Sequence, residues 1–115
     1  MIKSFQKTRI MVLELTDHNF ASQVSNDSKL TVVDFWAEWC GPCRALSNVI
    51  DELSEAYDGK ANIAKVNVAY NPELSILYNV SATPTILFIK DGAVVDKQVG
   101  TLSKIALEKR IRENL

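Results

Sequence analysis

The sequence predicts an α/β fold with a mixed central β-sheet of about five strands and helices on both faces. Residues 30–36 form a run of β-branched and aromatic side chains with apolar residues on both faces, as in buried parallel strands. After residue 43 the apolar side chains recur at helical spacing instead. Near the C-terminus, Asp91-Gly92 separates two apolar runs, which is a strong signal for a hairpin of antiparallel strands.

The other elements follow from local signals along the chain. Thr16 or Asp17 is expected to cap a brief first helix, and Asn71, followed by Pro72, to cap the third. Gly59 lies just past the end of the second helix. In chain order we predict a strand over 12–15, a helix near 17–25, a turn at 26–28, a strand over 30–36, a helix following Cys40-Gly41-Pro42-Cys43, a strand over 63–68, a helix opening at 71–72, strands over 85–89 and 93–99, and a helix from 103.

Length and charge narrow the function classes. The 115 residues suffice for one hydrophobic core, and the formal net charge is −1. No basic stripe suggests nucleic acid as a partner, and no apolar run approaches the ~18 residues of a membrane span. We therefore expect a monomer that binds neither nucleic acid nor membrane.

The first ten residues are expected to be an N-terminal extension, with a single domain over residues 11–115. They carry three positive charges, as the start of a secretory signal can. The apolar run Ile10-Met11-Val12-Leu13 is stopped by Glu14, however, short of the ~7–15 residues that such a signal needs. The expected location is therefore the cytoplasm, where thiols are mostly kept reduced. Met11 is also an alternative start.

The chemistry is expected at Cys40 and Cys43, the two cysteines of the chain, which stand where a buried strand ends and a helix begins. A bridge between them would close so short a loop that it contributes at most ~2 kcal/mol, too little for a structural role. Unpaired N–H groups at a helix N-terminus favour a thiolate over a thiol. Cys40 is therefore expected to be the exposed, attacking sulfur, and Cys43, one turn further on, the sheltered resolving thiol.

This pair predicts thiol–disulfide exchange. The thiolate of Cys40 attacks a substrate disulfide, and Cys43 then displaces the reduced substrate, which leaves a Cys40–Cys43 bridge. A reductase partner must regenerate the dithiol. Zinc sites use the same cysteine spacing, but zinc needs about four protein ligands, and the chain has no other cysteine and a single histidine, His18. We expect no metal and assign no role to His18.

Asp34 is the second residue that suggests chemistry. A carboxylate among the apolar residues of the strand over 30–36 is either buried, with a raised pKa, or points to water from a strand edge. We favour burial, because its neighbours are apolar on both sides. A buried acid six residues before Cys40 can take the proton of Cys43 when that thiol attacks. Lys65 lies in a similarly apolar strand and is either a neighbour of Asp34 or an exposed lysine. Trp36 is interpreted as core, and Trp39 as a contact surface.

The segment Asp34-Phe35-Trp36-Ala37-Glu38-Trp39-Cys40-Gly41-Pro42-Cys43 resembles the active-site segment of the thioredoxins, which are the familiar example of this cysteine motif. The resemblance runs from about Val12 to Leu115. It implies the thioredoxin fold, a cis bond before Pro84, and the buried pair Asp34 and Lys65 to manage the proton of Cys43. It also implies a substrate groove formed by Trp39, Gly41, Pro42, Thr83, Pro84 and Gly100.

The resemblance also implies partners. They are protein substrates with disulfides and a flavin-containing thioredoxin reductase that delivers electrons from NADPH. The domain itself is expected to hold no cofactor. Pro42 between the cysteines is the mark of a reductant in this family.

Three positions depart from the family pattern. Asn48 stands where most thioredoxins have a helix-kinking proline, so a straighter second helix is expected. Ala69 replaces the usual aspartate, which changes a local surface charge. Thr83 replaces the usual isoleucine or valine before the cis proline, as in some periplasmic isomerases and extracytoplasmic relatives. An extracytoplasmic, periplasmic location is therefore the minority interpretation.

Three alternatives to a general protein-disulfide reductase remain open. An oxidase or isomerase of an oxidising compartment would have a reduction potential well above the thioredoxin range. A binding module with incidental cysteines would keep its function when both cysteines are replaced by serine. A zinc knuckle would lose its metal to a chelator and unfold.

Overall fold

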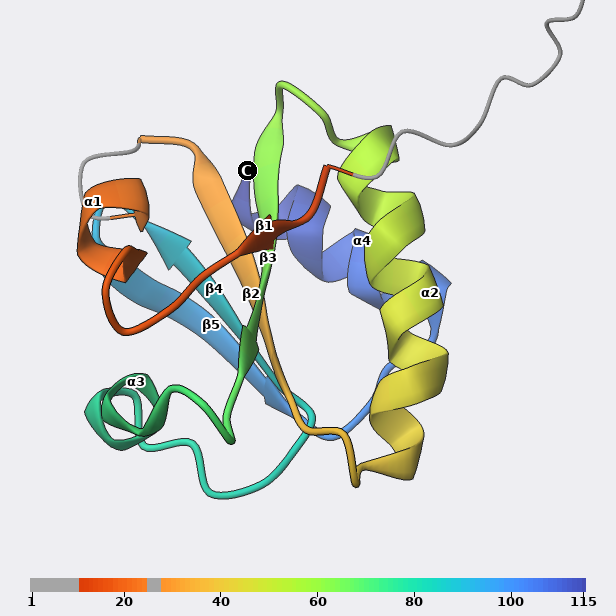
Figure 1. Ribbon diagram of the computed structural model, residues 1–115. Helices are drawn as coiled ribbons and strands as arrows, with labels where there is room; N and C mark the ends of the chain where they lie inside the picture. Colours follow the sequence, from red (N-terminus) through yellow and green to blue (C-terminus); the bar gives the residue numbers. More distant parts are fainter. Residues whose placement is uncertain (1–10, 25–27) are drawn as a thin grey trace, which may run out of the picture.

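Among residues 11–24 and 28–115, which the computed structural model describes, five strands form one sheet in the order β1-β3-β2-β4-β5 (Figure 1). The central strand β2 (Leu30–Trp36) is parallel to β3 (Ala61–Asn67) and antiparallel to β4 (Thr85–Lys90). Burial on both sides of β2 explains why this segment is almost wholly apolar. The predicted mixed sheet is confirmed.

The sheet has a short edge strand, β1, on one side and a largely exposed edge strand, β5, on the other. β1 (Leu13–Glu14) pairs with β3 and is shorter than the predicted strand over 12–15. β5 (Ala93–Val99) pairs with β4 through the predicted hairpin. At its turn Asp91 and Gly92 have φ of 53° and 78°, the positive values that a type I′ turn requires at both central residues.

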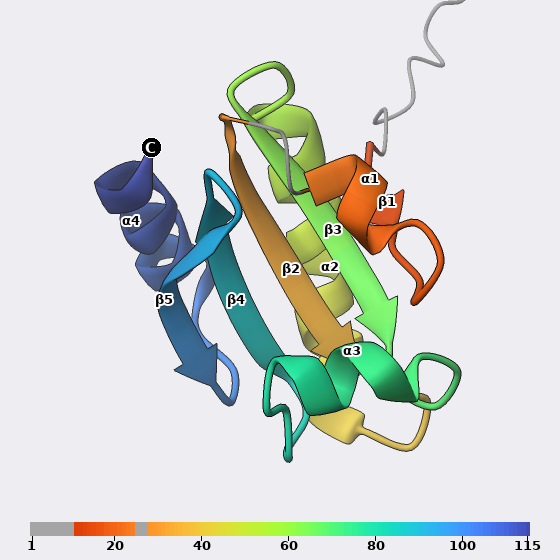
Figure 2. The same ribbon diagram turned by 90° about the vertical axis from the view of Figure 1, so that its left-hand side faces the viewer.

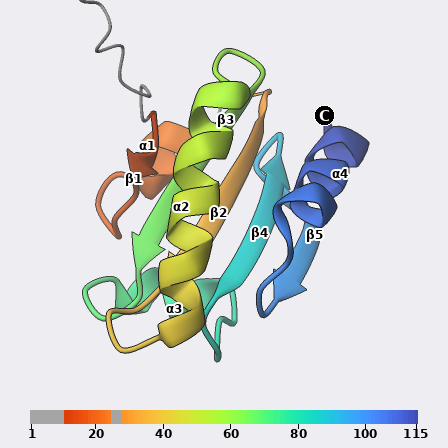
Figure 3. The same ribbon diagram turned by 90° about the vertical axis from the view of Figure 1, so that its right-hand side faces the viewer.

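In the described part of the chain, four helices cover the sheet in pairs. α1 (Phe20–Val24) and α3 (Pro72–Leu77) lie on one face, in front of the strands in Figure 2. α2 (Gly41–Ala56) and α4 (Lys104–Asn114) lie on the other, in front of the strands in Figure 3. Each pair closes its own apolar core, because the strands between them turn alternate side chains to the two faces. No helix of the described ranges is long and apolar enough to cross a membrane.

The structure corrects two predictions about helix N-termini, the first residue of α1 and the capping bond of α3. α1 begins at Phe20 rather than near residue 17, because Thr16 and Asn19 bond each other's backbone N–H groups in a turn that precedes it. Asn71 stands at the N-cap of α3 as predicted, but its side chain makes no capping bond to the helix. Asp17 of the distant β1–α1 loop supplies that bond instead. The end of the predicted first helix, the turn at 26–28 in part, and the extension over 1–10 lie outside the described residues.

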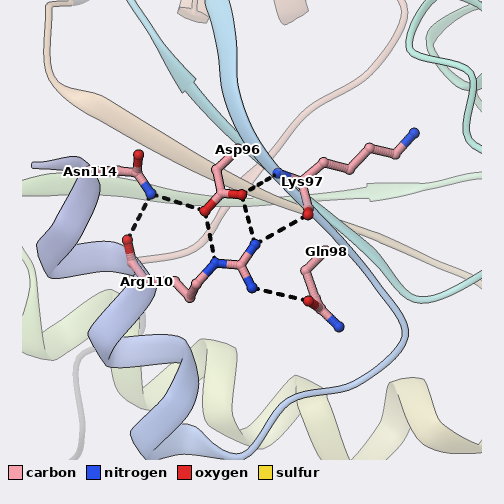
Figure 4. A network of polar contacts seen from close by, with 5 residues as sticks. All are labelled: Asp96, Lys97, Gln98, Arg110 and Asn114. Carbon is pink, nitrogen blue, oxygen red and sulfur yellow. Dashed lines mark hydrogen bonds and ion pairs between the residues drawn. The ribbon is translucent and has the colours of Figure 1, made fainter.

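A cluster of polar contacts joins the edge strand to the last helix (Figure 4). The carboxylate of Asp96 on β5 accepts hydrogen bonds from Nε and Nη2 of Arg110, both at 2.7 Å, and from Asn114 at 3.2 Å. Arg110 also donates to Gln98 and lies over the ring of Phe88, 5.5 Å from its centroid. The hydrogen bond from Arg110 holds the pKa of Asp96 below its usual value. Arg110 and Asn114 belong to α4, which lies on the face of the sheet opposite α1 and α3 (Figures 2 and 3).

We expect Asp96→Ala to lower the free energy of unfolding by about 2 kcal/mol at pH 7, since it removes charge-assisted hydrogen bonds. The difference from the native chain should shrink as the pH falls below the usual pKa of an aspartate, because protonation of the native Asp96 removes the same interaction. Urea unfolding of both chains at pH 7 and pH 3 measures it. An equal loss at both pH values would contradict an electrostatic origin.

Candidate active site

Cys40 and Cys43 are joined by a disulfide at the junction between β2 and α2, with their Cα atoms 5.4 Å apart. Cys40 is the N-cap residue of α2, and the backbone N–H of Cys43 donates to Sγ of Cys40 over 3.2 Å. Proline can occupy the first turn between them because that position needs no N–H partner. The helix N-terminus therefore directs a donor and its positive partial charge at the sulfur that the sequence marks as the nucleophile.

Both cysteines are buried, and Cys40 is slightly more exposed than Cys43, as expected. Cys40 is 7 % exposed and Cys43 is 3 % exposed. In this disulfide form Cys40 is thus not the exposed residue that the sequence predicted, because it packs with Ala37 and Cys43 in a small cluster covered by Trp36 and Val68. The neighbours of Cys40 on the surface are the exposed Trp39, Gly41 and Pro42.

Asp34 is buried, as predicted, and only 3 % of it is exposed. It lies opposite Lys65 in the register of β2 and β3, so the two residues are neighbours across the sheet. Burial raises the pKa of Asp34 to about 7, while the positive charge of Lys65 acts in the opposite direction. The chain therefore keeps, next to its disulfide, a carboxyl group that gains and loses its proton near neutral pH.

A cavity of about 280 Å³ connects these groups. Asp34, Cys43 and Lys65 all line it. Oδ1 of Asp34 and the indole N–H of Trp36, which also lines the cavity, are buried and have no hydrogen-bond partner among the described residues. Nζ of Lys65 lies 5.6 Å from the centroid of the Trp36 ring. Sequence reasoning missed Ser47 of the cavity wall, although its position four residues after Cys43 places it on the same face of α2.

A second, open cavity of about 330 Å³ lies between Trp39 and α3, and we call it the groove. Its walls carry no charged side chain; they are formed by Trp39, Val68, Pro72, Ser75, Ile76, Val80, Ser81, Ala82 and Thr83. Trp39 is 72 % exposed and Ile76 is 80 % exposed, which is unusual for large apolar side chains. Val68 joins the groove to the cysteines, because it also packs against their cluster.

The other predicted groove residues frame this cavity without lining it. The bond between Thr83 and Pro84 is cis, as the resemblance implied. Gly100 donates its backbone N–H to the carbonyl oxygen of Pro84, which fixes the two segments side by side. Of the six residues predicted to bind substrate, Trp39 and Thr83 line the groove, while Gly41, Pro42, Pro84 and Gly100 do not. Sequence reasoning missed Val68 and Ile76, because the sequence carries no signal that separates an apolar residue of a groove from one of the core.

The same geometry bears on metal binding. No group of three or more His, Cys, Asp and Glu side chains in the described ranges could hold a metal ion. Both cysteines are used in the disulfide, so neither is a thiolate ligand in this form.

Comparison with known proteins agrees with this geometry. A family model described as Thioredoxin matches residues 11–113. "Thioredoxin 2" of Chlorobaculum tepidum is 48% identical over 102 residues, which cover 89% of this chain and 94% of that protein. A "Thioredoxin" of Buchnera aphidicola is 38% identical over 104 residues, 90% of this chain and 96% of that protein. "Thioredoxin 1" of a Nostoc species is 37% identical over 102 residues, 89% of this chain and 95% of that protein.

A mixed five-stranded sheet with a redox-active cysteine pair at the start of a helix defines a thiol–disulfide oxidoreductase that reduces protein disulfides. The chain has the thioredoxin fold and belongs to the thioredoxin family.

Proposed function

We propose that the two cysteines act in a fixed order. The thiolate of Cys40 attacks one sulfur of a substrate disulfide and forms a mixed disulfide, and the second substrate sulfur leaves and takes a proton. Cys43, deprotonated, then attacks Sγ of Cys40; the substrate departs as a dithiol and the Cys40–Cys43 bridge forms. Two electrons pass from the protein to the substrate. The hydrogen bond from the N–H of Cys43 to Sγ of Cys40 carries this assignment, because it stabilises the thiolate of Cys40.

Asp34 and Lys65 are proposed to handle the proton of Cys43. Asp34 shares a cavity with Cys43, and its pKa of about 7 suits a group that must both accept and release a proton near neutral pH. Lys65 favours the charged form of Asp34 and so keeps part of the carboxyl population ready to act as a base. In the reverse direction, protonated Asp34 returns the proton to Cys43.

The substrate is proposed to bind as an extended segment around Trp39, Gly41, Pro42, Thr83, Pro84 and Gly100. The absence of charge from the groove walls favours apolar substrate side chains over charged ones. Contact through such a surface suits a chain with formal net charge −1, because little long-range attraction is available.

The wider setting is inferred from the family. We propose that residues 11–113, which the family model matches, and the last two residues form the working domain, a monomer of the cytoplasm. Electrons would reach the Cys40–Cys43 disulfide from NADPH through a thioredoxin reductase. That enzyme would reduce the bridge by the same exchange run in reverse, so the chain itself needs no bound cofactor.

The groove is tested with Trp39→Ala. We expect the rate constant for reduction of insulin by the reduced chain to fall about tenfold, the effect of losing one aromatic contact. The rate with hydroxyethyl disulfide, which is too small to fill the groove, should change less than about twofold. Stopped-flow fluorescence of Trp36, which packs against the cysteines, measures both rates.

Tyr70→Ala is the matched control for Trp39→Ala. Tyr70 is also 72 % exposed but does not line the groove, so its loss should leave both rates unchanged. Equal rates with insulin for Trp39→Ala and the native chain would overturn the proposed groove without touching the cysteine chemistry.

A further inference from the structure

α3 forms one wall of the groove but has little to hold it in place. It is six residues long and contributes Pro72, Ser75 and Ile76 to the groove. Leu74 is its buried residue, and the side chain at its N-cap makes no bond to the helix. A helix of this length is not stable alone, since nucleation costs more than two turns return. Its position must therefore be set by contacts from elsewhere in the chain.

Asp17 makes the first of these contacts from the loop after β1. Its Oδ1 accepts the backbone N–H of Leu74 at 2.9 Å, and its Oδ2 accepts that of Glu73 at 3.4 Å. A carboxylate here also meets the positive end of the helix. The loop is itself held by the reciprocal bonds between Thr16 and Asn19. A residue 57 positions away in sequence thus does the work of an N-cap.

Asn71 extends the contact to the end of β3. Its Oδ1 accepts the backbone N–H of Asp17 at 2.9 Å, and its Nδ2 donates to the carbonyl oxygen of Asn67 at 3.0 Å. Asn67 in turn accepts the N–H of Ala69 at its Oδ1. Asn67 and Asn71 are both buried, so these bonds are shielded from water. They bracket Val68, the residue shared by the groove and the cysteine cluster.

We propose that Asp17 is a positioning residue for substrate binding, acting through α3 and Asn71 on the wall of the groove opposite Trp39. Without its carboxylate, the N–H groups of Glu73 and Leu74 lose their partners, and α3 is freer to shift relative to Trp39. A protein substrate that spans both walls then loses contact, while a small disulfide that reaches only Cys40 does not. The inference rests on the proposed groove and deepens it by naming what fixes its shape.

The test compares Asp17→Ala, Asp17→Asn and the native chain in the reduced form. For Asp17→Ala we expect the rate constant with insulin to fall about fivefold and the rate with hydroxyethyl disulfide to stay within about twofold. Asp17→Asn keeps one oxygen for the N–H of Leu74, so it should lose less than about twofold with insulin. Amide hydrogen exchange should be faster at Glu73 and Leu74 in Asp17→Ala, and unchanged in β2. If Asp17→Ala does not fold, Asp17→Asn and the exchange of these two amides carry the test.

Asp96→Ala is the matched control, because Asp96 also joins two elements through its carboxylate (Figure 4), but its partner helix α4 lies on the face of the sheet opposite α3 (Figures 2 and 3). It should lose stability and keep both rates. Equal losses with insulin for Asp17→Ala and Asp96→Ala would overturn the inference, since general destabilisation would explain them. A normal insulin rate in Asp17→Ala beside a slow one in Trp39→Ala would overturn the inference and leave the groove standing. Normal insulin rates in both would overturn the groove as well.

Discussion

Replacing Cys40 by serine is expected to abolish disulfide reduction, with a loss of at least about a thousandfold. A serine hydroxyl is not ionised near neutral pH, and the helix N-terminus that stabilises a thiolate at this position cannot make it a comparable nucleophile. The measurement is insulin reduction driven by dithiothreitol, and separately by NADPH with a thioredoxin reductase. The second assay also tests the proposed electron source.

Cys43→Ser is the companion variant, and it should stop the reaction at a later step than Cys40→Ser does. Cys40 can still attack, but the mixed disulfide has no resolving thiol and should accumulate as a covalent complex with insulin, visible by non-reducing electrophoresis. Trapping through Cys40 after Cys43→Ser, and none after Cys40→Ser, would establish the order of attack. The reverse pattern would reverse the roles. Activity that survives loss of both cysteines would identify a binding module instead.

Asp34→Asn is expected to stabilise the folded chain by about 4 kcal/mol above pH 8 and by almost nothing below pH 4. The native carboxyl has a pKa of about 7 when folded and an ordinary one near 3.8 when unfolded. Below pH 4 both states bind the proton, so the group has no effect. Between these values only the folded state keeps it, and stability falls as the pH rises. Above pH 7 the whole cost of a buried charge is present.

Urea unfolding of the oxidised native and Asp34→Asn chains, from pH 4 to 8, measures this difference directly. Other titrating groups contribute equally to both chains and cancel. Asp51→Asn is the control: Asp51 of α2 lines the same cavity but is only half-buried, and its replacement should give no such gain. A difference in stability between native and Asp34→Asn that does not vary with pH would mean that folding does not raise the pKa of Asp34.

The elements of the fold were predictable because each has a strong local signal. The run of apolar residues over 30–36 allows only a buried strand, and Asp91-Gly92 allows only a tight turn with positive φ. Ser103 was placed at the start of α4, where its Oγ accepts the N–H of Ala106. The start of α3 at Pro72 was predictable too, but its capping bond comes from Asp17, a contact between segments far apart in sequence. No local pattern encodes such a contact.

The buried residues beside the cysteines were predictable in the same way. Burial of Asp34 followed from its apolar neighbours, and its pairing with Lys65 is a register between two predicted strands. The residues of the groove were harder to predict from the sequence. Val68 and Ile76 belong to it only because the end of β3 and the helix α3 fold toward Trp39, and a single apolar residue in a sequence does not indicate whether it faces the core or a partner.

The buried carboxyl of Asp34 has a consequence for how such a chain can change under selection. A library screened only for resistance to heat would be expected to replace Asp34 early, since its neutral substitutes remove the cost of a buried charge. On the role proposed for Asp34, the surviving variants would be more stable but slower, because the proton of Cys43 would have lost its acceptor. Engineers who want a thermostable reductase therefore need a screen that also demands turnover.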